Sequence, residues 1–123
     1  MDLLTACRDP RLFAPWFKDP ATWASWQVFL RALFGLPIEG EEELATFTRC
    51  TGRAAPPTEQ ASEAWLVCGR RSGKSRMLAL MAVYLSCFKD WRQHLAAGER
   101  ATVMLIASTA SRRASSRSTS WRC

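Results

Sequence analysis

The segment GRRSGKS at residues 69–75 has residue types and spacing suited to binding phosphate groups. Its two glycines allow the backbone to curl with N–H groups pointing inward, and a helix predicted to begin near Lys74 adds further donors. Lys74 would reach the β- and γ-phosphates of a nucleotide, and the Ser75 hydroxyl would ligate Mg²⁺. The segment therefore predicts a loop that binds ATP and Mg²⁺ through Gly69, Arg70, Arg71, Ser72, Gly73, Lys74 and Ser75.

One position departs from the usual pattern of such loops. The pattern places a glycine five positions before the second glycine, where this chain has Cys68, and Gly69 follows one place later. Two roles stay open for Arg70 and Arg71, which lie inside the loop. They supply surface charge, or they stabilise charge that develops on the γ-phosphate, which would make Arg70 a catalytic arginine supplied in cis.

Hydrophobic patterns predict the elements that position the loop. Continuous apolar runs at 64–68 and 102–107 are typical of buried parallel strands. Between them, residues 76–88 are rich in good helix formers. The order strand, glycine-rich turn and helix is the expected context of a phosphate-binding loop.

Two helices are predicted upstream of the loop, after an irregular stretch at 1–18. The first begins at Asp19-Pro20 and ends at Gly35, and its aromatic face, with Trp23, Trp26 and Leu30, is expected to pack against a sheet. The second follows an acid-rich start at residues 39–43 and ends at Gly52.

Composition limits the class of protein. The 123 residues are 48% hydrophobic and 23% charged, which is typical of one soluble domain. No apolar run is long enough for a membrane span and no secretory signal is evident, so we expect no membrane partner and a cytoplasmic location in a host cell. Five widely spaced cysteines and a single histidine argue against a zinc site and predict reduced thiols.

Charge is distributed unevenly along the chain. Residues 1–60 hold 6 Lys/Arg and 8 Asp/Glu, a net charge of −2, whereas residues 61–123 hold 11 and 3, a net charge of +8. This asymmetry predicts an anionic partner, either nucleotide phosphate or nucleic acid. The final stretch, 110–123, is rich in serine and arginine, and it predicts a disordered tail or a shifted reading frame.

Three segments resemble the N-terminal ATPase region of phage terminase large subunits, the motors that package and cut viral DNA. They are residues 19–37, 50–91 and 98–109, and the similarity as a whole covers about residues 12–109. The resemblance implies an α/β fold, namely a partial P-loop NTPase domain of the additional-strand class with an N-terminal helical segment. It also implies a loop arginine, such as Arg70, and an adenine-contacting segment upstream of the loop, at Gln60 or within 56–60.

The resemblance implies ATP and Mg²⁺ as ligands, and double-stranded DNA with a portal or small terminase subunit as partners of the intact parent. It also implies a later acidic motif and a nuclease domain, but no Asp or Glu occurs after Glu99. We therefore expect an N-terminal terminase fragment that lacks a competent active site. Its expected parts are a helical segment at 1–63, a strand-helix-strand unit at 64–109 and a tail at 110–123.

Two alternatives stay open. One is a small P-loop nucleotide-binding protein or kinase-like enzyme, for which Asp90 and Glu99 are the candidate acids. The other is a basic nucleic-acid-binding protein that acts through its tail.

Overall fold

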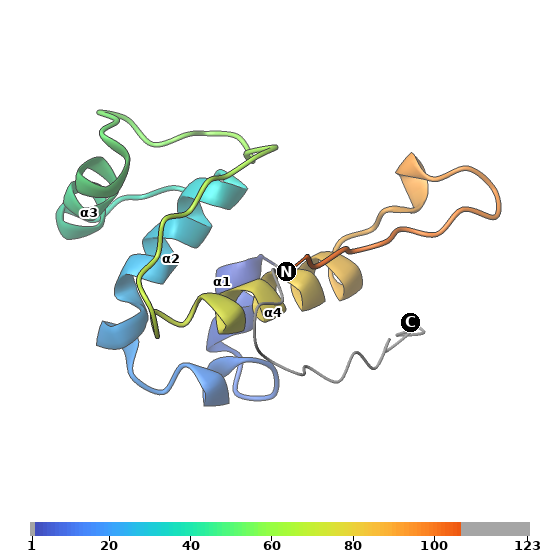
Figure 1. Ribbon diagram of the computed structural model, residues 1–123, viewed down its shortest axis with the longest axis horizontal. Coiled ribbons are helices and arrows are strands. Elements are labelled where there is room, and N and C mark those ends of the chain that lie inside the picture. The colour runs from blue at the N-terminus through green and yellow to red at the C-terminus, as the bar shows by residue number, and fades with distance from the viewer. Residues whose placement is uncertain (1, 107–123) are drawn as a thin grey trace. The chain divides into compact units, whose positions relative to one another are not determined.

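The computed structural model describes residues 2–106, so the predicted tail at 110–123 lies outside the described residues. They form α1 (Leu3–Arg8), η1 (Ala14–Trp16), α2 (Pro20–Phe34), α3 (Glu41–Thr51), α4 (Lys74–Cys87) and η2 (Arg92–His94) (Figure 1). Two compact units meet in the sequence between Lys74 and Ser75. The expected division of the chain after residues 63 and 109 stays a prediction.

Helix α2 begins and ends where the sequence predicts. The Asp19 carboxylate accepts a hydrogen bond from the backbone N–H of Ala21 at 3.1 Å, and Pro20 is the first helical residue. At the other end Gly35 adopts a left-handed conformation with φ 65°, which glycine tolerates without strain.

Helix α3 packs against α2 around a small apolar cluster. Val28 of α2, Ile38 of the connection and Phe47 of α3 are buried together, with Ala32 partly buried against them. The connection is also held by Arg31, whose Nη1 donates to the Pro37 carbonyl at 2.8 Å and whose Nε lies 3.4 Å from Glu43 Oε2. Glutamates fill the first turn of α3, as predicted.

Helix α1 corrects the expectation that residues 1–18 are irregular. Asp2 forms its N-cap and accepts a hydrogen bond from the Thr5 backbone N–H at 2.8 Å. The helix buries Leu3, Leu4 and Ala6 and contacts α2. Two residues in the sequence could have predicted this short helix: Asp2, a favourable N-cap residue, and Pro10, which prevents a longer helix.

The second unit contains almost all of α4. The presence of this helix confirms the one predicted at 76–88. Met77, Leu80 and Tyr84 are its buried residues, at helical spacing. Trp91 Nε1 donates to the Leu85 carbonyl at 2.6 Å and holds the chain that leads into η2 beside the last turn of α4. No helix within residues 2–106 is long and apolar enough to cross a membrane.

The predicted α/β fold is wrong for the described residues, because residues 2–106 contain helices and no strand. The described parts of the two apolar runs that predicted buried strands are irregular, and residues 64–67 and 102–106 are exposed. Trp65 is 88% exposed in the first run, and Ile106 is 87% exposed in the second. A buried strand requires neighbours that pair with its backbone, and an apolar pattern predicts the strand without supplying those neighbours. Residues 2–106 therefore do not form the partial P-loop NTPase fold of the additional-strand class.

Candidate phosphate-binding loop

The segment that leads into the loop is fastened to α2 at two points. The Ala61 backbone N–H donates to the Leu33 carbonyl at 2.9 Å, and Trp26 Nε1 donates to the Ser72 carbonyl at 2.8 Å. Leu33 and Trp26 are separated by about 10 Å along the helix axis, whereas the chain from 61 to 72 would span about 36 Å if fully extended. The segment runs beside α2 (Figure 1), and its extended length is greater than the distance between its two attachment points. It therefore does not form one straight strand.

Two backbone conformations shape the loop itself. Arg71 and Gly73 are both left-handed, with φ 60° and 85°. Glycine is required at residue 73 for a second reason, because a Cβ there would lie 2.8 and 2.9 Å from two carbon atoms of the Trp23 ring. Arg71 is the only residue other than glycine with a positive φ in the described part of the chain. Such strained residues concentrate at functional loops.

Lys74 is the first residue of α4, which confirms the predicted start of the helix. Its ammonium group is folded back over the loop, where Nζ donates to the Gly69 carbonyl at 3.3 Å. The first N–H groups of a helix have no acceptor within the helix, and the helix dipole adds partial positive charge there. The helix start and the lysine therefore present positive charge at the same end of the loop.

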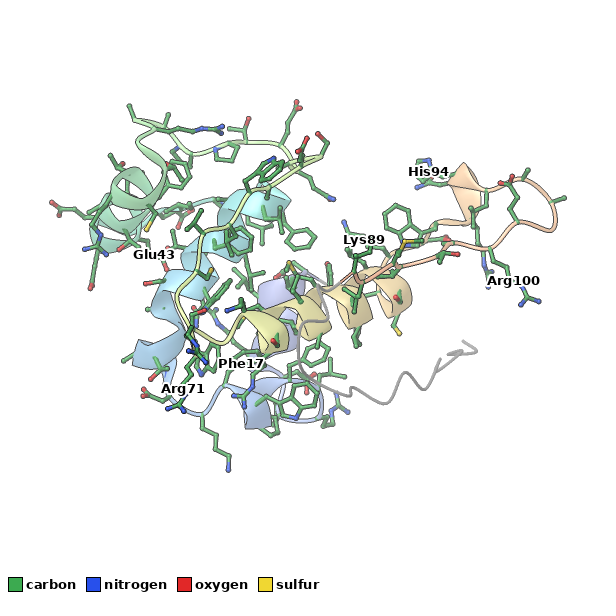
Figure 2. The ribbon with its side chains drawn as sticks, viewed as in Figure 1. Phe17, Glu43, Arg71, Lys89, His94 and Arg100 are labelled. Atoms are coloured by element: carbon green, nitrogen blue, oxygen red, sulfur yellow. The ribbon has the colours of Figure 1, made fainter. Side chains whose placement is uncertain are left out.

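The surroundings of the loop reinforce its positive charge. Arg70, Arg71 and Lys74 are exposed, and no acidic residue occurs in the sequence between Glu63 and Asp90. Figure 2 shows Arg71 near the N-terminal end of α2. An anion that approaches the loop meets these cations without competition from a neighbouring carboxylate in this stretch of sequence.

The two serines of the motif differ in their surroundings. Ser72 Oγ is buried and has no hydrogen-bond partner among the described residues, whereas Ser75, the second residue of α4, is exposed. No group of three or more His, Cys, Asp or Glu side chains in residues 2–106 could hold a metal ion. Mg²⁺ bound to a nucleotide needs only one or two protein ligands, because phosphates and water complete its shell. The Ser75 hydroxyl is compatible with that role.

Other predicted residues lie away from the loop. Gln60 is exposed, and its segment lies against the C-terminal end of α2, where a Cβ on Gly35 would be 2.5 Å from the Glu59 carbonyl carbon. The adenine-contacting role of residues 56–60 stays a prediction. Asp90 and Glu99 have local roles, because they accept hydrogen bonds from the backbone N–H groups of Arg92 at 3.0 Å and Ala96 at 2.9 Å.

Sequence reasoning missed the contribution of α2 to the loop. It placed Trp23 and Trp26 in a face that covers a sheet, and the structure places both, half-buried, against Ser72 and Gly73 instead. Helical spacing shows that the two tryptophans share a face, but it carries no information about which distant segment covers that face.

Comparison with known proteins adds no relative: no family model, curated protein or solved structure matches the chain.

Proposed function

We propose that the segment 69–75 binds the triphosphate of ATP together with Mg²⁺, as the nucleotide-binding part of a terminase-like DNA-packaging ATPase. One observation carries the proposal. Lys74 begins α4 directly after the left-handed Gly73, and its ammonium group lies over the loop, within hydrogen-bond distance of the Gly69 carbonyl. This is the loop-to-helix junction that a phosphate-binding motif requires.

Lys74, Arg70, Ser75 and the backbone of the loop each have a part in this proposal. The contact between Lys74 and Gly69 is exposed and long, so the ammonium group exchanges it readily for a phosphate oxygen. The backbone N–H groups that follow Gly69 and those at the start of α4 would donate to the phosphates. Arg70 is exposed and free to approach the γ-phosphate, where it would act as the cis arginine. Ser75 would ligate Mg²⁺.

The wider role rests on the terminase resemblance. On that basis, the proposed partners are double-stranded DNA and a portal or small terminase subunit, which would bind the assembly that contains the loop. The run of positive charge from Arg70 to Arg76, with no acid nearby in the sequence, is consistent with anionic ligands.

Calorimetric titration with ATP and Mg²⁺ tests the proposal. Lys74→Ala removes the charge that faces the β- and γ-phosphates, and we expect it to weaken binding by more than about tenfold. Lys89→Ala is the matched control, because Lys89 is an exposed lysine beyond the end of α4. Ser75→Ala should weaken binding only when Mg²⁺ is present. Equal affinities in the wild type and Lys74→Ala would refute the proposal.

A further inference from the structure

We propose that Trp26 is a positioning residue for the phosphate-binding loop, with its indole N–H fixing the direction of the Gly73 backbone N–H. This inference rests on the proposed function of the loop. It assigns a role to a residue 46 positions before Ser72 in the sequence, on a helix outside the motif.

The geometry of one peptide group carries the inference. Trp26 Nε1 donates to the Ser72 carbonyl at 2.8 Å, and the described residues contain no cis peptide bond. In a planar trans peptide, the C=O and the N–H that follows it point in opposite directions. The Ser72 carbonyl is directed at the indole, so the Gly73 N–H is directed away from it. A loop that binds an anion needs its carbonyl oxygens turned away from the ligand and its N–H groups turned toward it.

Trp23 completes the arrangement from the same face of α2. Its ring occupies the space where a side chain on residue 73 would be, so the left-handed glycine lies directly against the ring. Each tryptophan is itself held by an edge-to-face aromatic contact. The Trp23 and Phe17 ring centroids are 5.1 Å apart, and those of Trp26 and Phe29 are 5.8 Å apart. Figure 2 shows Phe17 and Arg71 near the N-terminal end of α2.

The hydrogen bond of the Trp26 indole and the packing of its ring can be tested separately. A tryptophan that only filled space beside the loop would be replaced without loss by a ring of the same shape that lacks the N–H. A tryptophan that orients the loop would lose function with that replacement. The benzothiophene analogue of tryptophan, in which sulfur replaces the N–H, makes this distinction with little change of volume.

The experiment measures affinity for Mg²⁺-ATP by calorimetry in four forms of the full chain: wild type, Trp26→Phe, the benzothiophene analogue at residue 26, and Trp65→Phe. Trp65→Phe is the matched control, because Trp65 Nε1 also donates one hydrogen bond, to Glu63 Oε1 at 2.6 Å, but in an exposed segment before the loop. We expect about a tenfold loss of affinity in both Trp26 variants and no change in the control. Circular dichroism establishes that each form is folded.

A spectroscopic readout accompanies the affinities. The indole ¹H–¹⁵N resonance of Trp26 should shift when Mg²⁺-ATP is added, and that of Trp65 should stay in place. If the wild type binds ATP and the benzothiophene analogue binds it equally well, the inference is overturned while the proposed function stands. If the wild type shows no affinity for ATP, the proposed function fails, and the inference fails with it.

Discussion

Replacing Gly73 by alanine should destabilise the first unit more than a replacement at any glycine that lacks a close neighbour. Gly73 has φ 85°, and a Cβ at that position would lie 2.8 Å from the nearest carbon of the Trp23 ring. Carbon atoms do not approach so closely, so either the ring or the loop must move. The perturbation therefore tests the contact between α2 and the loop.

Two effects contribute to the expected loss of stability. The left-handed backbone costs a residue with a Cβ about 1–2 kcal/mol. Overpacking against a held ring costs about 1–3 kcal/mol more. We therefore expect Gly73→Ala to lower the free energy of unfolding by about 2–5 kcal/mol.

The assay is urea unfolding followed by tryptophan fluorescence, with Gly52→Ala as the matched control. Gly52 is also left-handed, with φ 70°, but its Cβ would meet nothing within 4 Å. Gly52→Ala should therefore show the backbone effect alone, about 1–2 kcal/mol.

A double-mutant cycle isolates the steric effect. Trp23→Ala removes the ring, so Gly73→Ala should cost less in that background by about 1–3 kcal/mol. Our account of the loop is refuted if Gly73→Ala costs no more than Gly52→Ala, or if the cost is unchanged when Trp23 is alanine.

Three further predictions concern groups outside that contact. The Thr22 hydroxyl lowers the pKa of the Asp19 carboxyl. The ionised Asp19 therefore stabilises α2 above about pH 4, and this stabilisation is lost as the pH falls further. Circular dichroism should show this loss in the wild type and not in Asp19→Asn. Burial raises the pKa of the Cys7 thiol to about 11, so iodoacetamide should modify Cys7 more slowly than the exposed Cys50 and Cys87, as measured by peptide mass spectrometry. Arg71→Gly should raise the free energy of unfolding by about 1 kcal/mol, because glycine relieves the left-handed strain at φ 60°; an unchanged urea midpoint would contradict this.

The helix ends could be predicted from the sequence because each depends on a few neighbouring residues. Asp19-Pro20 and Gly35 delimit α2 through a side-chain cap and a left-handed glycine, and Gly52 ends α3 in the same way. The start of α4 at Lys74 follows similarly from the motif.

The strands were predicted wrongly because a strand depends on partners that a local pattern does not contain. The apolar run that includes Trp65 and Val67 has the composition of a buried strand, yet both side chains are exposed. The contact between Trp26 and Ser72 was missed for the same reason. It joins a side chain to a backbone carbonyl across 46 residues, and nothing in the spacing of either segment indicates it.

The central claim, that residues 69–75 bind nucleotide phosphates, is tested most directly by a ¹H–¹⁵N NMR titration of the chain with Mg²⁺-ATP. Our account predicts that the largest changes in backbone amide shift fall between Gly69 and Ser75, and that Lys74→Ala abolishes them. Shift changes that are concentrated elsewhere in the chain, or that persist at full size in Lys74→Ala, would contradict it.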